Sequence, residues 1–298
     1  MNCSVAKSSV RMKKMSRTAG LNRSVAGNIV MLLFILLLGS FMALPLVYAI
    51  SNSLKPLDEL WAFPPRFFVR NPTFTNFKDL TEAMSDSWVP FSRYLCNTVV
   101  ISVVGTGGHL VLASLCAYAF AKHRFPGRNI MFQTVVLSLM FSGTVTAIPS
   151  FMIFSGLHLI NSHWALILPA FCSSLGLYLM KQFIEQLIPD ALLEAARIDG
   201  AGEWRIFWGI VMPIVKPAWL TLIIYSFQGL WNTGSNTLIQ NEQLKTLNYA
   251  LSQIVSGGVA RAGTAAAASV IMMAVPIVIF LFSQSSIVET MATSGMKD

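Results

Sequence analysis

The sequence has 298 residues, of which 54% are hydrophobic and only 11% are charged, with a mean hydropathy of +0.62. Soluble domains carry about 25% charged residues, so this chain has too little polar surface to close as a soluble globule. The same composition excludes a disordered chain, a coiled coil and a disulfide-stapled module, and the four cysteines show no CxxC spacing typical of zinc or redox sites. We therefore expect an all-α integral membrane protein.

Six apolar stretches predict six transmembrane helices. They cover residues 26–50, 98–120, 130–154, 164–180, 217–233 and 262–283. Most are close to the roughly 20 residues that cross the hydrocarbon of a bilayer, and none contains Asp, Glu, Lys or Arg. The first stretch is longer than the core of a cleavable signal peptide and lacks a small-residue cleavage site after it, so we expect it to remain as an anchor.

The distribution of positive charge predicts the topology. Fourteen of the 21 Lys and Arg residues fall on the side that holds both termini, which predicts cytoplasmic N- and C-termini. This topology accounts for the net charge of +8 without a nucleic-acid partner. The expected divisions are a basic cytoplasmic tail (1–25), a first transmembrane helix (26–50), an extracytoplasmic segment (51–91), a membrane domain (92–286) and a cytoplasmic tail (287–298).

The extracytoplasmic segment between the first two helices is rich in proline and aromatic residues. Its prolines make it too irregular for one long helix or for a central strand. We expect an ordered surface cap, in which Trp61 and Trp88 suit the level of the lipid headgroups.

The membrane stretches hold few groups for ion coupling or catalysis. His109 is the only ionisable residue at depth, and because no partner for a proton relay is visible, we expect a packed, hydrogen-bonded histidine. The sequence has no HExxH, GxSxG or Walker A pattern. These features disfavour a secondary transporter and an integral-membrane enzyme.

The loop at residues 188–218 predicts a helix, a turn and a second helix. Pro189 and Asp190 suit the first turn of a helix, and Gly200 with Gly202 allows the chain to reverse. The second helix carries three aromatic rings at helical spacing, which predict a docking face or, alternatively, a helix that lies on headgroups. These rings are Trp204, Phe207 and Trp208.

This loop resembles the EAA loop of binding-protein-dependent ABC import permeases. The matching positions are Glu194, Ala195, Ala196, Gly200, Ile210 and Pro213, within a loop at residues 185–217. The chain is similar to the carbohydrate-uptake branch, in particular to the second permease subunit of maltose-type importers. Met212 stands where the family usually has Leu, which is a conservative departure.

The resemblance implies the transmembrane domain of an ABC type I importer over residues 92–286, in the inner membrane of a bacterial cell. Implied partners are a second homologous permease, two ATP-binding subunits and an extracytoplasmic sugar-binding protein. The chain itself is expected to bind no cofactor, since ATP and Mg would lie on the ATPase. The residues expected to couple to the ATPase are Glu194, Ala195, Ala196, Asp199, Gly200, Trp204, Phe207, Trp208 and Pro213.

Two of these residues have open alternatives. Glu194 is expected to contact the ATPase, or else to form an ordinary i, i+3 pair with Arg197. Asp199 is disfavoured by the helix dipole at the end of the first helix, so we expect it to cap the second helix or to pair with the ATPase.

The fifth membrane stretch offers a path for a sugar. Its polar and aromatic side chains have approximately helical spacing, and inter-helix hydrogen bonding is the alternative role. They are Tyr225, Gln228, Trp231, Asn232 and Asn236. The expected function is uptake of a sugar, in particular an oligosaccharide; a permease for a non-sugar solute and a secondary transporter are the alternatives.

Overall fold

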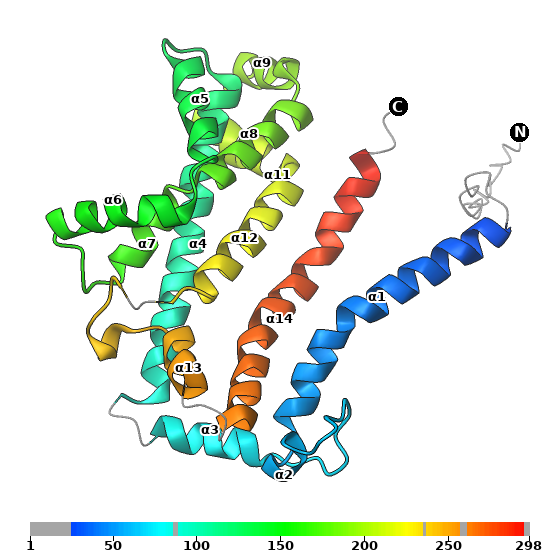
Figure 1. The fold of residues 1–298 in the computed structure, drawn as a ribbon. Coiled ribbons are helices and arrows are strands. Elements are labelled where there is room, and N and C mark those ends of the chain that lie inside the picture. The colour runs from blue at the N-terminus through cyan, green and yellow to red at the C-terminus, as the bar shows by residue number, and fades with distance from the viewer. Residues whose placement is uncertain (1–24, 86–88, 235–236, 257–260, 295–298) are drawn as a thin grey trace, which may run out of the picture. The chain divides into compact units, whose positions relative to one another are not determined.

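The computed structural model describes residues 25–85, 89–234, 237–256 and 261–294 (Figure 1). Every regular element in these ranges is helical. The chain divides into two compact units, residues 1–47 and 48–298.

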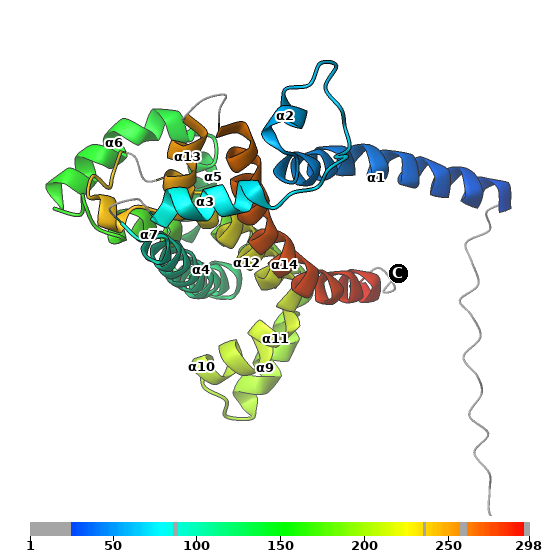
Figure 2. The same cartoon turned by 90° about the horizontal axis from the view of Figure 1, so that it is seen from below.

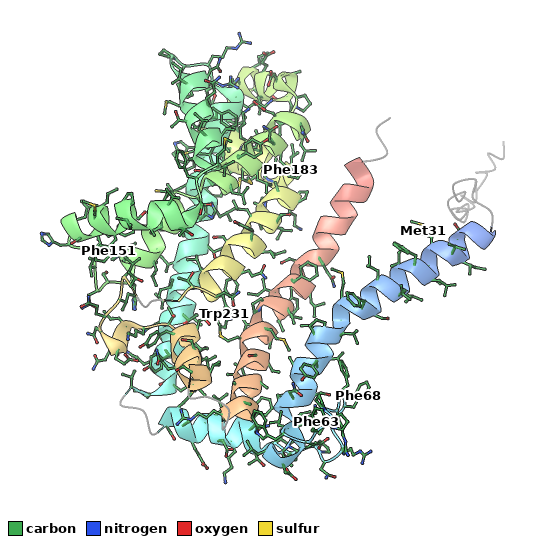
Figure 3. The ribbon with its side chains drawn as sticks, viewed as in Figure 1. Met31, Phe63, Phe68, Phe151, Phe183 and Trp231 are labelled. Carbon is green, nitrogen blue, oxygen red and sulfur yellow. The ribbon has the colours of Figure 1, made fainter. Side chains whose placement is uncertain are left out.

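The first unit consists, in its described part, of helix α1 up to Val47. Helix α1 spans Val25–Ser53, which confirms a helix over the first predicted stretch. Along residues 27–47 almost all its side chains are apolar and exposed, as at Met31, labelled in Figure 3. An uninterrupted apolar helix of this length is long enough to cross hydrocarbon.

The second unit begins with the last turns of α1 and an irregular segment that contains two helices, α2 (Leu57–Leu60) and α3 (Thr75–Ser85). Two buried charged side chains, Lys55 and Glu59, form hydrogen bonds that hold this irregular segment in place. Lys55 Nζ donates a hydrogen bond to Asn52 Oδ1 at 2.8 Å, and Glu59 Oε1 accepts one from the Arg70 N–H at 2.8 Å. Phe63 is 95% exposed on this segment (Figure 3). The irregular segment predicted from the prolines is thus present, while its position as an extracytoplasmic cap stays a prediction and Trp88 lies outside the described residues.

The long helix α4 (Phe91–Lys122) is the axis of the second unit. Helices α7 (Trp164–Phe171), α8 (Ser174–Leu187) and α12 (Lys216–Trp231) pack along it (Figure 1). Small residues permit these contacts: a side chain at Gly108 would overlap the ring of Phe171. Close approach at small residues is the usual way in which helices pack where there is no water to drive association.

The third predicted stretch, residues 130–154, is not one helix. It forms two helices, α5 (Arg128–Ser138) and α6 (Gly143–Gly156), and the chain bends by 112° between them. Ser142 causes the new start, because its Oγ accepts a hydrogen bond from the Thr144 N–H and caps α6. The expectation of one continuous helix here is therefore wrong. The fourth stretch is also interrupted, between α7 and α8.

The remaining elements complete the second unit. They are α9 (Asp190–Ile198), α10 (Glu203–Ile206), a π-helical turn η1 (Phe207–Val211), α11 (Met212–Ile214), a 3₁₀ turn η2 (Glu242–Leu244), α13 (Leu247–Ser256) and α14 (Ala262–Ser294). Helices α9, α10 and α11 lie together, apart from α3 and α13 (Figure 2). Among the described residues, four segments are long and apolar enough to span a membrane, or six if each strongly bent helix pair is one span.

Candidate functional site

Helices α9 and α10 form a short hairpin, residues 190–206, that contains the predicted turn. Gly200 has φ +81°, in the left-handed region where a side chain is strained. Helix α9 ends at Ile198 with Asp199 as its C-terminal cap, and Gly202, in extended conformation, is the N-terminal cap of α10. The prediction that Gly200 reverses the chain is confirmed.

The three aromatic rings after the turn do not share one exposed face. Trp204 is 67% exposed and Trp208 is 49% exposed, but Phe207 is only 2% exposed. The ring of Phe207 lies 5.6 Å from that of Tyr118 on α4. The expectation that Phe207 contacts a partner is therefore wrong. Phe207 follows Trp204 at ordinary helical spacing, but its position faces α4, so its ring is buried while that of Trp204 stays exposed.

The other predicted coupling residues lie along the hairpin and after it. Glu194 and Ala195 are exposed on α9, whereas Ala196 is buried. Pro213 lies in the first turn of α11. Asp199 is the C-terminal cap of α9 and does not cap α10, so that part of its prediction is wrong. Pairing of Asp199 with an ATPase stays a prediction.

Arg197 does not pair with Glu194 in this structure. Its Nε donates a hydrogen bond to Glu203 Oε1 at 2.8 Å, which raises the pKa of the Arg197 guanidinium above its ordinary value. The alternative role of Glu194 as the partner of Arg197 is thus wrong. The carboxylate of Glu194 lies on the exposed side of α9.

The start of α9 is held by the end of α4. Lys122 Nζ donates hydrogen bonds to the Ile188 carbonyl at 2.6 Å and to Asp190 Oδ1 at 2.7 Å. The Lys122 ammonium holds the pKa of the Asp190 carboxyl below its usual range. Asp190 is in the first turn of its helix, as predicted, where the helix dipole also favours a negative charge.

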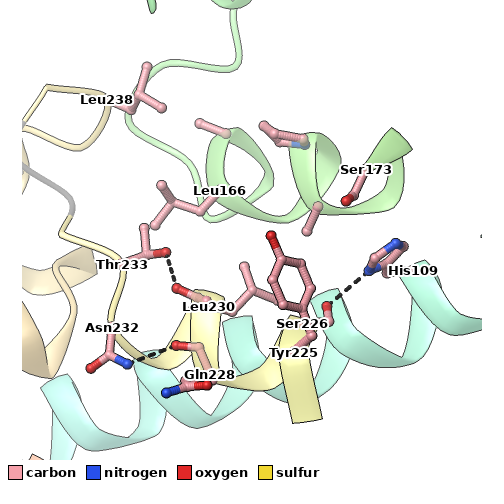
Figure 4. A pocket seen from close by; sticks show the side chains of 14 residues that line it. His109, Leu166, Ser173, Tyr225, Ser226, Gln228, Leu230, Asn232, Thr233 and Leu238 are labelled. Atoms are coloured by element: carbon pink, nitrogen blue, oxygen red, sulfur yellow. Dashed lines mark hydrogen bonds between the residues drawn. The ribbon is translucent and has the colours of Figure 1, made fainter. Parts of the chain in front are cut away.

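A cavity of about 640 Å³ lies between α4, α7 and α12 (Figure 4). This volume is within the range of about 300 to 1,000 Å³ that is typical of small-molecule sites. Its wall is mostly apolar, with neutral hydrogen-bonding groups at several points. These polar lining residues are His109, Ser173, Tyr225, Ser226, Gln228, Asn232 and Thr233.

Three of the five residues predicted for a substrate path line this cavity: Tyr225, Gln228 and Asn232. Trp231 does not. Its ring is 2% exposed, stacks on Phe227, and donates from Nε1 to the Met272 carbonyl of α14 at 3.0 Å. The assignment of Trp231 to the substrate path is therefore wrong, and the alternative role of inter-helix hydrogen bonding is confirmed for it, because its position on α12 faces α14. Asn236 lies outside the described residues.

His109 is hydrogen-bonded as predicted, since its Nδ1 lies 3.0 Å from Ser226 Oγ. Its place in the wall of the cavity was not predicted. A side chain at Gly176 of α8 would overlap the imidazole, so His109 fits only because Gly176 has none. Neither this contact nor the roles of Ser173, Ser226 and Thr233 has a signal in the linear sequence, because each depends on which helices meet.

One end of the cavity is bordered by the loop after α12, through Leu238. Asn161 holds this loop: its backbone N–H donates to the Leu238 carbonyl at 2.9 Å. Its Oδ1 accepts from the Gln240 and Asn241 N–H groups at 2.9 and 2.7 Å.

Among the described residues no cluster of three or more His, Cys, Asp or Glu side chains is placed to hold a metal ion.

Comparison with known proteins identifies the family. Residues 109–292, which include α9, α10 and most of the cavity wall, match the model of the binding-protein-dependent transport system inner membrane component. The chain belongs to this permease family. The match covers more than half of the sequence. It includes the loop at residues 185–217 that resembles the EAA loop.

Curated relatives of the permease have named substrates of two kinds. This chain is 30% identical to the arabinooligosaccharides transport system permease protein AraQ of Bacillus subtilis (strain 168), over 90% of its own length and 95% of the length of AraQ. It is 39% identical to the sn-glycerol-3-phosphate transport system permease protein UgpE of Yersinia enterocolitica, over 48% of this chain and 50% of that one.

A solved structure shares the fold of the permease. A bacterial ABC transporter involved in the import of the acidic polysaccharide alginate superposes with a TM-score of 0.73 and 22% identity. The superposition covers 88% of this chain and 98% of that one. The all-helical architecture described above is therefore that of an ABC importer permease.

Proposed function

We propose that this permease forms half of the membrane path of an ATP-driven importer for oligosaccharides. It would cross the bacterial inner membrane six times, with each bent helix pair counted as one span and both termini in the cytoplasm. Its proposed partners are a second homologous permease, two ATP-binding subunits that carry ATP and Mg, and an extracytoplasmic sugar-binding protein. No catalytic step is assigned to this chain.

The observation that carries the proposal is the chemistry of the cavity. Hydroxyl and amide groups of Tyr225, Gln228 and Asn232 lie among apolar side chains in the wall of the cavity (Figure 4). Sugars present hydroxyl groups that donate and accept hydrogen bonds and apolar faces that pack on rings. A mainly apolar wall with a few placed polar groups fits both properties.

Family relationship supports the same class of substrate. A relative that aligns along almost its whole length is named for arabinooligosaccharides, and the superposed transporter is involved in the import of a polysaccharide. The relative named for sn-glycerol-3-phosphate aligns over only half of its length. A phosphorylated solute is therefore the competitor that the test must include.

The proposal is tested by reconstituting the permease with its partner subunits and binding protein in proteoliposomes that contain ATP. We expect uptake of labelled neutral oligosaccharides, and no comparable uptake of sn-glycerol-3-phosphate. Uptake of the phosphate ester alone would refute the oligosaccharide assignment.

A variant of the cavity wall connects that activity to this site. Gln228→Leu keeps the volume but removes the amide, so loss of one or two hydrogen bonds should lower uptake about fivefold to tenfold. The matched control is Thr221→Val on the same helix, because the Thr221 hydroxyl bonds its own helix at Pro217 and does not line the cavity. Equal effects of the two variants would place the substrate elsewhere.

A further inference from the structure

Glu203, the first residue of α10, joins three elements through one carboxylate. The Tyr118 hydroxyl of α4 donates a hydrogen bond to Glu203 Oε2 at 2.7 Å. Arg197 Nε of α9 donates to Oε1 at 2.8 Å, and His123 Nε2, just after α4, lies 3.5 Å from Oε2. The carboxylate therefore ties both helices of the hairpin to the end of α4.

Two other contacts join the hairpin to the same end of α4. Lys122 binds the start of α9 at Asp190, as described above. Between the two polar contacts, the hairpin residues Leu193, Ala196 and Ile206 pack in one core with Tyr118 and with Phe207, the first residue after the hairpin. The hairpin is thus seated by its buried side, and its opposite side presents exposed groups such as Ile198 and Trp204.

Helix α4 is also a wall of the cavity. His109 lies nine residues before Tyr118, which is about 14 Å along a helix at 1.5 Å per residue. Helix α4 has no break between the two positions. A displacement of its end must therefore move His109 or bend the helix.

The covalent connections of the hairpin are less direct. Helix α8 enters it through two extended residues, Ile188 and Pro189. On the other side the chain passes a π-helical turn and an 80° bend before α12 begins. Breaks of this kind act as hinges, whereas a continuous helix transmits rigid-body motion.

We propose that Glu203 is a positioning residue that makes the hairpin move as one body with α4, so that a displacement of the hairpin reaches the cavity through α4. This role rests on the proposed function, in which the ATPase subunits displace the hairpin. Glu203 is half exposed, and exposed ion pairs add little to stability, so its effect falls on coupling rather than on folding.

A distance measurement tests the tie without any substrate. In the assembled complex, with the four native cysteines of this chain replaced by serine, spin labels are placed at the exposed positions Arg124 and Ile198. We expect one narrow distance distribution, which Glu203→Gln broadens and Tyr118→Phe broadens less. An unchanged distribution in Glu203→Gln overturns the proposal.

The control is Glu185→Gln. Glu185 is likewise a partly exposed glutamate with two cationic partners, Lys181 and Arg128, but these lie on α8 and α5 and do not touch the hairpin. Its substitution should leave the distance distribution as in the parent complex. Equal broadening by Glu185→Gln would show a general loosening and would also overturn the proposal.

Kinetics of the reconstituted complex give a second readout. Loss of charge-assisted hydrogen bonds at Glu203 should lower kcat for substrate-stimulated ATP hydrolysis about tenfold and leave KM for the loaded binding protein within about twofold. The effects of Tyr118→Phe and Glu203→Gln should be less than additive, because the two variants break the same contact. Fully additive effects, or a rise in KM alone, contradict the positioning role.

The two proposals fail in different ways. If the parent complex imports no oligosaccharide, the proposed substrate class is wrong, while the spin-label distances still decide whether Glu203 ties the hairpin to α4. If the parent complex transports and the distances do not respond to Glu203→Gln, the substrate class stands and the positioning role is wrong.

Discussion

The hairpin and the helices that line the cavity both pack on α4, but through different kinds of contact. At the hairpin, charged side chains bridge the elements, as Lys122 and Asp190 do. At the cavity, His109 and Ser226 form a hydrogen bond between two helices without a charged partner. A third helix approaches closely there because Gly176 has no side chain. Both regions thus use polar contacts, but only the hairpin uses full charges.

The difference follows from the surroundings. The carboxylates of the charged pairs at the hairpin keep much of their hydration, since the side chains of Asp190 and Glu203 are 77% and 46% exposed, and only Lys122, at 7%, loses most of its water. In the membrane part a charge is costly, and close backbone approach with neutral hydrogen bonds is the available means of holding helices together. The contrast teaches that the hairpin can respond to pH and ionic strength, whereas the cavity is sensitive mainly to side-chain volume.

The largest expected effect separates the buried ring of Phe207, just after the hairpin, from the exposed ring of Trp204. Phe207→Ala should lower the free energy of unfolding by about 3 to 5 kcal/mol, because it opens a cavity in the core around Tyr118. Trp204→Ala should leave that free energy almost unchanged and instead weaken binding of the ATPase by about thirtyfold, or about 2 kcal/mol. Thermal unfolding in detergent and co-purification of the ATPase measure the two effects. Similar unfolding behaviour of both variants would contradict the burial described here.

Gly176→Ala tests the cavity region. A methyl group there would overlap the His109 ring and lie 2.8 Å from Leu222 Cδ1, so the bond to Ser226 must break or the helices must separate. Overpacking of this kind costs about 1 to 3 kcal/mol, which should appear as a lower unfolding midpoint and reduced uptake. Gly107→Ala is the matched control, since the space around Gly107 is open. A midpoint as low in the control as in Gly176→Ala would remove the distinction.

Gly200→Ala tests the turn of the hairpin. The space around Gly200 is also open, so the cost is the backbone strain of a side chain at φ +81°, about 1 kcal/mol. We expect weaker recovery of the ATPase with normal insertion into the membrane. Gly202→Ala has an ordinary φ of −71° and should behave as the parent protein. Unimpaired recovery with Gly200→Ala would show that the turn tolerates side chains.

The smallest effect is the pH dependence of the Lys122–Asp190 contact. Because the pKa of Asp190 is lowered in the folded protein, its contribution is present above the ordinary carboxyl pKa and is lost as the pH falls through the lowered value. The difference in unfolding midpoint between the parent and Asp190→Asn should be small at pH 7 and should disappear once the pH is below the lowered pKa of Asp190. High salt should also reduce it. A difference independent of pH would mean that the amide itself disturbs the structure.

The sequence by itself determined the class of the protein and several local features. Apolar runs without charges suffice to predict helices at α1, α4, α12 and α14, because length and hydropathy decide whether a segment can cross hydrocarbon. The Gly200 turn was also predictable, since only glycine adopts positive φ without strain. Such features depend on a residue and its neighbours in the chain.

The tertiary structure decided what depends on the partner of each side chain. The 112° bend between α5 and α6 occurs inside an apolar run, where hydropathy gives no sign of it. Phe207 and Trp231 were placed by assuming regular helical spacing and a free face, but each is buried by another helix, Phe207 against Tyr118 of α4 and Trp231 against Met272 of α14. His109 joined the cavity wall because Gly176 leaves room for it, and that room exists only once α4 and α8 have packed.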